Sequence, residues 1–237
     1  MFYTGDINTN VTKEEKEILK KISDFCFHYG DKYVVKELEK LVFDANNAAL
    51  SYYFVIGIDG SNKEAHQEII IESKNPEYNY LCAKLFKNKK KEHAQAVIDS
   101  KDSKYNYLFA KEIFDSNKKA HEQALLDGEG SKYNIYFAKK IRGADIAAHQ
   151  QKIIESNDPL YIAWFANELQ SEGADIDALQ QAILQTEDVL EIESFARNVH
   201  KSNKDLLLKT VEKLQEEERT QDANKIKKLI YNVTNLE

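Results

Sequence analysis

Four histidines recur at a nearly constant interval and are the side chains of this chain best suited to chemistry. They stand 27, 28 and 28 residues apart, at His66, His93, His121 and His149. Because imidazole titrates near neutral pH and binds metals readily, such a column suggests a metal site or a pH sensor. The same register continues at Leu179 and Leu207, however. The position therefore also accepts an apolar group.

A packing role explains the histidine column better than metal binding does. Equivalent side chains of stacked helical repeats lie roughly 9–10 Å apart, the usual distance between packed helices. Metal ligands lie about 2 Å from the ion, so side chains at that spacing cannot share one metal. We therefore expect half-buried imidazoles that pack between repeats and hydrogen-bond a neighbour. Each stands near the start of a predicted helix, where the helix dipole disfavours imidazolium, so we expect neutral histidines at pH 7.

The chain carries none of the common catalytic motifs. It lacks His-Glu-x-x-His, Gly-x-Ser-x-Gly, a phosphate loop and Cys-x-x-Cys. Only 8 glycines and 2 prolines occur among 237 residues. This scarcity excludes turn-rich β sandwiches and barrels and leaves no material for a glycine-rich phosphate loop. The sequence therefore predicts no catalytic residue, no metal and no cofactor.

The histidine interval belongs to an internal repeat that also fixes the predicted helices. An alanine recurs with steps of 27, 28, 28 and 30 residues, at positions 83, 110, 138, 166 and 196. One column of helix-capping residues precedes it, at Asn75, Asp102, Gly130, Asp158 and Asp188. A second cap column, with Lys89 as its exception, is Asn62, Asn117, Asp145, Asp175 and Asn203. Pro76 and Pro159 follow two caps at the first helical position, where proline is favoured.

Each repeat is expected to hold two short helices. The first runs about eleven residues, for example over 159–169, and the second helices are expected over 63–72, 90–99, 118–127, 146–155 and 176–185. Further helices are predicted over 12–29, 31–44, 203–218 and 223–233. Helices this short are marginal alone, but stacked hairpins bury both apolar faces.

The sequence thus predicts an all-α fold built as one continuous domain. We expect a right-handed α-solenoid of about six stacked hairpins. Its parts are an N-terminal cap hairpin over 1–45, repeats of 27–30 residues over 46–214, and a C-terminal cap helix over 215–237.

The repeated segment Tyr-x-Tyr-x-Phe-Ala-Lys, with the later Gly143-Ala144-Asp145-Ile146 and Gly173-Ala174-Asp175-Ile176, resembles short α-hairpin repeats of bacterial and phage proteins. The resemblance covers roughly residues 46–214. In shape it is similar to HEAT and tetratricopeptide solenoids, although the longer tetratricopeptide consensus does not fit. It implies a non-enzymatic scaffold that binds another macromolecule. By analogy, it suggests an inhibitor, an adaptor or an immunity or anti-defence protein.

Charge is distributed in bands along the chain, whose net charge is −7. Residues 73–142 carry 15 basic and 9 acidic side chains, whereas residues 143–200 carry 2 basic and 11 acidic ones. All but one of the cations in the basic band are lysines, while proteins that read nucleic acids usually carry more arginine. The banding favours electrostatic docking to a protein partner. Binding to a nucleic-acid backbone is the alternative, and a merely solvated lysine-rich surface is the third interpretation.

The predicted partner-binding residues follow from this band and from a polar column two residues after the histidines. The lysines are Lys84, Lys87, Lys89, Lys90, Lys91, Lys111 and Lys139. The glutamines are Gln95, Gln123 and Gln151. Glutamines in this column either face a concave groove, where solenoids usually bind, or are plain surface residues.

Tyrosines on the first helices permit two interpretations. They are Tyr78, Tyr80, Tyr105, Tyr107, Tyr133, Tyr136 and Tyr161. Aromatic side chains at repeat spacing are expected in the core between repeats. The alternative is a platform for base stacking beside the lysine column.

The sequence also predicts a cytoplasmic protein that does not span a membrane. No apolar run approaches the roughly 18 residues that a span needs, and the N-terminus shows no signal peptide. Cys26 and Cys82 stand in apolar contexts and are expected as buried thiols of a reducing compartment. The oligomeric state is not determined by the sequence.

Overall fold

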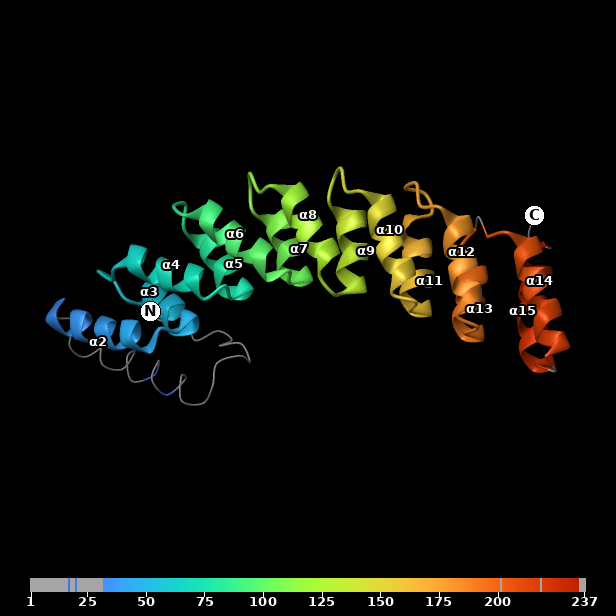
Figure 1. Cartoon of the computed structure of the whole chain (residues 1–237), viewed down its shortest axis with the longest axis horizontal. Helices are drawn as coiled ribbons and strands as arrows, with labels where there is room; N and C mark the ends of the chain where they lie inside the picture. Colours follow the sequence, from blue (N-terminus) through green and yellow to red (C-terminus); the bar gives the residue numbers. More distant parts are fainter. Residues whose placement is uncertain (1–16, 18–19, 21–31, 201, 218, 235–237) are drawn as a thin grey trace. The chain divides into compact units, whose positions relative to one another are not determined.

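The computed structural model describes residues 17, 20, 32–200, 202–217 and 219–234. Within these ranges all regular structure is helical, and the helices are labelled α2 to α15 (Figure 1). The predicted all-α class is therefore confirmed for the described part of the chain. The helix expected over 12–29 and the thiol of Cys26 lie outside the described residues.

The contacts divide the chain into two compact units, residues 1–117 and 118–237. The first holds α2 (Lys32–Ala45), α3 (Ala48–Gly57), α4 (Lys63–Glu72), α5 (Pro76–Leu85), α6 (Lys90–Ser100) and α7 (Ser103–Glu112). The second holds α8 (Lys118–Asp127), α9 (Ser131–Lys140), α10 (Ile146–Glu155), α11 (Pro159–Leu169), α12 (Ile176–Gln185), α13 (Val189–Asn198), α14 (Lys204–Glu216) and α15 (Thr220–Thr234). The expected single domain stays a prediction.

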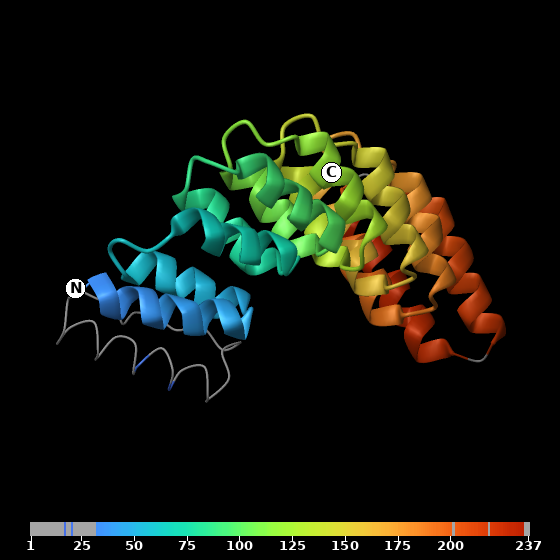
Figure 2. The ribbon, with the colours of Figure 1, turned by 60° about the vertical axis from the view of Figure 1, so that its left-hand side comes forward.

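Within each unit the helices form two layers of a helical repeat. In the first unit α3, α5 and α7 pack in succession, and α4 packs on α6. In the second unit α9, α11, α13 and α15 form one layer, while α8, α10 and α12 form the other (Figure 2). Helices of the two layers pack on each other as hairpins, such as α5 with α6 and α11 with α12. This pattern confirms a repeated helical architecture within each unit.

The helix boundaries match the predicted cap columns closely. Asn75 Oδ1 accepts the N–H groups of Glu77 and Tyr78, and Asp145 Oδ1 accepts that of Ala148. The side chains of Asp102, Asp158, Asp175 and Asp188 cap their helices in the same way. Gly130 and Lys89 occupy cap positions without a side-chain hydrogen bond. The expected second helices therefore agree with the observed ones to within one residue.

Two tight turns need the conformational freedom of glycine. Gly143 and Gly173 have φ angles of 84° and 100°, in the region that L side chains rarely adopt. Each lies two residues before the N-cap of a helix, which makes the connection from the preceding helix short. Asp115 takes a left-handed φ of 62° in the equivalent turn after α7.

A column of phenylalanines forms the centre of the core in both units. Phe54, Phe109, Phe137, Phe165 and Phe195 are all fully buried. Cys82 takes the same register on α5 and is also fully buried. Burial raises the pKa of the Cys82 thiol to about 12, so it packs as a small apolar group and is not a reactive thiolate.

The caps lead to a paired prediction on α12. The change Asp175→Ala removes the carboxylate that accepts the Ala178 N–H and is expected to cost about 1 kcal/mol of stability. The change Asp177→Ala, at an exposed position of the same turn, is expected to cost less than about 0.5 kcal/mol. Urea unfolding of both variants measures the difference. Equal losses would show that helix charge, and not the cap, is responsible.

Candidate functional site

The four repeated histidines are buried and do not form a surface ladder. His66, His93, His121 and His149 all have no exposed area. The expectation of half-buried side chains was therefore wrong, because the helices of adjacent hairpins close completely over the rings. His149 contacts its own hairpin through Phe137, with 5.3 Å between ring centroids, and the preceding hairpin through Glu122 Oε1, 3.2 Å from its Nε2. These positions agree with the expected role in packing between repeats.

A buried asparagine holds each of two histidines in place. Asn79 Nδ2 donates to the backbone oxygens of Ile70 and Asn75, both at 2.8 Å. Its Oδ1 therefore faces His93 Nδ1, at 2.8 Å. Because that oxygen only accepts, the proton of the neutral imidazole belongs on Nδ1. One amide thus connects α4, α5 and α6.

The second unit repeats this arrangement. Asn134 Oδ1 lies 2.8 Å from His149 Nδ1, and Asn134 Nδ2 donates to the Gly130 oxygen at 3.3 Å. In the first unit, Asn106 is buried like Asn79 and donates to the oxygens of Val97 and Asp102. These asparagines were not predicted from the sequence.

A signal for the asparagine–histidine pair is nevertheless present in the sequence. Two repeats hold an asparagine and a histidine at these two positions, namely Asn79 with His93 and Asn134 with His149. Two later repeats hold an isoleucine and a leucine at the same positions, namely Ile162 with Leu179 and Ile192 with Leu207. The polar pair is thus replaced as a unit by an apolar pair, whose members are all buried. This exchange within one chain indicates direct contact between the two positions.

The first repeat departs from the pair and holds a serine instead. Ser51 takes the asparagine register and lies fully buried, as does His66. Within the described residues Ser51 Oγ and His66 Nδ1 have no hydrogen-bond partner. Glu39 Oε1 lies 3.3 Å from His66 Nε2. Serine, histidine and glutamate are the residue types of a hydrolase triad, but here burial closes them off from a substrate.

Burial keeps the histidines neutral. It lowers the pKa of His93, His121 and His149 to about 4. The pKa of His66 is also lowered by burial, against the opposing effect of Glu39. The expected neutral state at pH 7 therefore agrees with the structure. Its main cause is loss of solvent and not the helix dipole named from the sequence.

A second polar column, directly after the histidines, ties one hairpin to the next. Gln150 Oε1 accepts the backbone N–H of Asp175 at 2.8 Å. Gln180 Oε1 accepts that of Asn203 at 2.6 Å, while its Nε2 donates to the Asn203 oxygen. Glu122 makes the same contact with the Asp145 N–H at 2.6 Å. This column was not predicted from the sequence, because amides and carboxylates on helices are usually solvent-exposed.

Glu122 is the exception in this column because it can ionise. Its Oε1 lies 3.2 Å from His149 Nε2, and burial raises the pKa of its carboxyl group. Gln67, Gln150 and Gln180 take this register in other repeats.

Three of the seven lysines predicted to bind a partner form ion pairs within the chain. Lys84 Nζ lies 2.8 Å from Glu112 Oε2, and Lys139 pairs with Glu168. Lys89 lies 2.8 Å from Glu68. Lys84 and Lys139 also stand in the last turn of their helices, where a cation complements the helix dipole.

The other four predicted lysines lie on the surface of the first unit. Lys87, Lys91 and Lys111 are exposed and Lys90 is half-buried. Lys111 Nζ lies over the Tyr107 ring, 5.4 Å from its centroid. Lys87, Lys89, Lys90 and Lys91 thus stand together before and at the start of α6, whereas Lys84 and Lys139 pair with glutamates of other helices.

The predicted glutamines lie on the surface and bond along their own helices. Gln95 donates to Asp99, Gln123 to Asp127, and Gln151 to Glu155, at 2.7, 2.8 and 3.0 Å. All three are exposed. Each pair joins residues four apart, as neighbouring side chains on one helix face do.

The tyrosines divide between core and surface. Tyr78, Tyr80 and Tyr107 are buried, as expected for core side chains, whereas Tyr105, Tyr133, Tyr136 and Tyr161 are half-buried.

In the second unit the half-buried tyrosines form an aromatic cluster with the single tryptophan. Trp164 lies 5.7 Å from Tyr136 and 6.1 Å from Tyr161 between ring centroids, and Tyr136 lies 6.0 Å from Tyr133. The cluster spans α9 and α11.

Two exposed leucines stand on α11, which carries part of the aromatic cluster, and on α13, which packs on α11. Leu160 and Leu190 are 53% and 69% exposed. They hold the same register, two residues after the N-caps of α11 and α13. Earlier repeats carry Glu77, Lys104 and Lys132 there. Leu160 is four residues before Trp164, so both side chains lie on one helix face. We call Leu160, Leu190 and the aromatic cluster the leucine–aromatic face.

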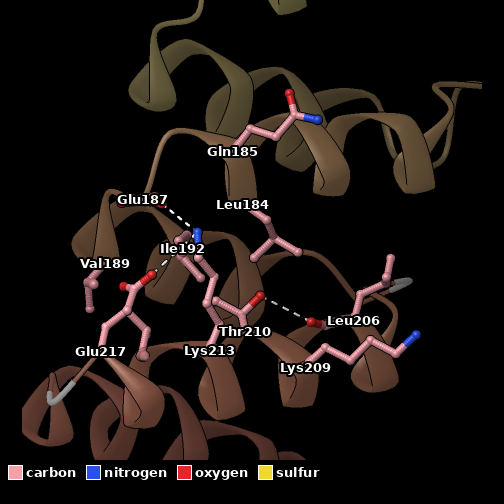
Figure 3. A pocket seen from close by; sticks show the side chains of 11 residues that line it. Leu184, Gln185, Glu187, Val189, Ile192, Leu206, Lys209, Thr210, Lys213 and Glu217 are labelled. Carbon is pink, nitrogen blue, oxygen red and sulfur yellow. Dashed lines mark hydrogen bonds and ion pairs between the residues drawn. The ribbon is translucent and has the colours of Figure 1, made fainter.

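A shallow cavity of about 410 Å³ opens between α12, α13 and α14 (Figure 3). Gln180 holds one end of α14 through Asn203, and Lys213 pairs with Glu187 towards the other end. Leu184, Ile192, Leu206 and Leu214 are among the residues that line it. Its polar residues carry both signs of charge, so the cavity does not select a charged ligand.

The described residues include no candidate metal site or membrane span. No three His, Cys, Asp or Glu side chains among them gather as metal ligands do. No helix in the described ranges is long and apolar enough to cross a bilayer. Comparison with protein-family models, curated proteins and solved structures finds no match to this chain. The functional argument therefore depends on the residues themselves.

The Asn79–His93 pair can be tested by a double-mutant cycle. Either His93→Leu or Asn79→Ile alone leaves a buried polar group without its partner and should cost about 1–3 kcal/mol. The combined variant recreates the apolar pair of Ile162 and Leu179, so its cost should be clearly below the sum of the single costs. Urea unfolding of the four proteins at pH 7.5 measures the coupling. Additive costs would contradict direct contact.

The lowered histidine pKa values predict acid sensitivity. The unfolded chain binds protons below pH 6.5, whereas the folded rings stay neutral to about pH 4. Stability should therefore fall over this range, by about 2 kcal/mol per histidine at pH 5. The raised pKa of Glu122 has the opposite effect on stability, because the folded carboxyl group binds its proton more readily than the unfolded one does. Urea unfolding at pH 7.5, 6 and 5 should show a smaller loss for the combined Asn79→Ile, His93→Leu variant. An equal loss in variant and wild type would refute this assignment.

Proposed function

We propose that this protein is a non-enzymatic scaffold that binds another protein through the leucine–aromatic face. The observation that carries the proposal is the exposure of Leu160 and Leu190 in one register of two neighbouring helices. Three other repeats place charged side chains there, at Glu77, Lys104 and Lys132, so the fold does not require leucine. An exposed apolar register beside an aromatic cluster is typical of a protein interface.

The rigidity of the helices that carry this face also supports binding. Helices α9, α11 and α13 pack in succession, and their inward side chains Phe137, Phe165 and Phe195 are fully buried. Side chains on such rigid elements lose little conformational freedom when a partner binds. Trp and Tyr are the residues that most often dominate interface energetics.

Nucleic-acid backbone binding is the second candidate. Lys87 and Lys91 are exposed, and no ion pair is described for either. Helix α6 begins at Lys90 without a side-chain cap, so its N–H groups and the lysines together attract anions. The ion pairs of Lys84, Lys89 and Lys139 weigh against this candidate, because they neutralise three of the predicted contacts.

The handedness of the fold, the number of hairpins and the cellular location are part of the same proposal. The proposed fold is a right-handed α-solenoid of about six hairpins. The protein works in the cytoplasm of a bacterium or during phage infection. There it acts as an inhibitor or immunity-type protein that occupies its partner. These elements rest on the repeat pattern and its resemblance to short α-hairpin repeats.

Photocrosslinking distinguishes the two candidates. A benzophenone amino acid is placed at Leu190 and, as a control, at exposed Gln181 on α12, in cells that naturally produce the protein. The expected result is a discrete protein adduct from position 190 and none from position 181. Adducts of equal yield from both positions would contradict a specific face.

The nucleic-acid candidate has its own test. In a gel-shift assay at low salt, the triple variant Lys87→Glu, Lys90→Glu, Lys91→Glu is compared with wild type. The proposed function predicts no specific shift for either protein. A salt-sensitive shift that the triple variant abolishes would favour the nucleic-acid candidate.

A further inference from the structure

We infer that the leucine–aromatic face recognises a cationic amphipathic helix of its partner protein. This inference rests on the proposed function and adds the chemical class of the bound segment. It is carried by the two exposed leucines, the aromatic cluster beside them and the carboxylates that surround them.

The apolar part of the face matches the spacing of a helix. Leu160 and Leu190 are equivalent side chains of packed helices, so they stand roughly 8–10 Å apart. Two apolar residues at i and i+7 of a partner helix are separated by about 10 Å along its axis. A helix that crosses α11 and α13 can therefore place one such residue on each leucine. Trp164, one turn after Leu160, adds an aromatic contact.

Carboxylates frame the two leucines. Asp158 and Asp188 directly precede the helices that carry them, and each is held in place by accepting backbone N–H groups of its helix. Glu191 follows Leu190 directly. Burial raises the pKa of Glu191, and so do the nearby charges of Asp188 and Asp158. The two leucines thus share a field of at least three carboxylates.

Lys132 of α9 places its Nζ over the Tyr136 ring at the edge of the face, 5.5 Å from the centroid, but few cations offset the field around the two leucines. Between residues 143 and 200 the chain has Lys152 and Arg197 as its cations, against 11 acidic residues. Arg197 lies in the last turn of α13, at the opposite end of the helix from Leu190. A partner with lysine or arginine on both sides of an apolar stripe would complement the face. Such side chains bury their apolar stems and extend their charges towards carboxylates.

The binding assay uses the full chain and two model peptides of 18 residues. One peptide is an amphipathic helix of leucine and lysine, and the other replaces each lysine by glutamate. Trp164 is the only tryptophan of the chain, so its fluorescence reports binding directly. The expected result is a saturable change with the leucine–lysine peptide, and at least 10-fold weaker binding of the leucine–glutamate peptide.

Two double variants separate the apolar and charged contributions. The double variant Leu160→Glu, Leu190→Glu adds negative charge but removes the apolar contact. It should fold, because Glu77 occupies the same register in an earlier repeat. It should weaken binding of the leucine–lysine peptide at least 10-fold. Asp158→Asn with Asp188→Asn keeps both caps, since asparagine caps helices as well as aspartate does. It should weaken binding about 3- to 10-fold and reduce its salt dependence.

A matched control lies in the first unit. Leu85 is also exposed, and Leu85→Glu should change the affinity by less than 2-fold. Equal binding of both peptides, or leucine–lysine binding that neither double variant weakens, would overturn the inference. So would a wild-type dimer in sedimentation equilibrium that Leu160→Glu with Leu190→Glu dissociates, because the occupant would then be a second copy.

The inference can fail while the proposed function stands. If position 190 crosslinks to a cellular protein but the leucine–lysine peptide does not bind, the scaffold function is supported and the cationic helix is excluded. If position 190 yields no adduct distinct from that of position 181, the proposed function itself fails.

Discussion

Where the repeat carries it, a buried asparagine is the interaction that fixes the register of the helices around it. Asn79 contacts the end of α4, the start of its own helix α5 and the ring of His93 on α6. A polar network in a low-dielectric interior is favourable only when each member has its partner. A shift of one hairpin against the next would break several such bonds at once. The network therefore fixes the register of the stack as well as its stability.

This interior leaves little freedom for chemistry inside the described core. The histidines that could bind a proton or a metal are held neutral and enclosed between helices. In a repeat that lacks the asparagine–histidine pair, Ile162 and Leu179 occupy the same two positions. Gln180 then holds the next helix through the Asn203 backbone. Both the asparagine–histidine pair and the isoleucine–leucine pair use interior side chains for packing, which is why the proposed function is placed on the surface.

Most of the repeated surface residues stabilise their own helix or its contact with a neighbouring one. Lysines near helix ends pair with glutamates of the equivalent helix in the next hairpin, and aspartates before helices serve as caps. Exposed glutamines bond to acids one turn later. Leu160 and Leu190 have no such stabilising role, because an exposed leucine adds little to the stability of its own helix. That contrast, more than the charge bands, points to the leucine–aromatic face as the binding surface.

The sequence alone determined the helices, because caps, prolines and apolar spacing act within a few residues. It also indicated that the histidine register is a packing position, since leucine replaces histidine at Leu179 and Leu207. Burial depth, the asparagine partners, the ion pairs of the lysines and the exposure of Leu160 and Leu190 were decided only by the tertiary structure. Each depends on contacts between different helices, for example 14 residues apart for Asn79 and His93 and 28 for Lys84 and Glu112. A local pattern carries little information about which neighbour covers a given face.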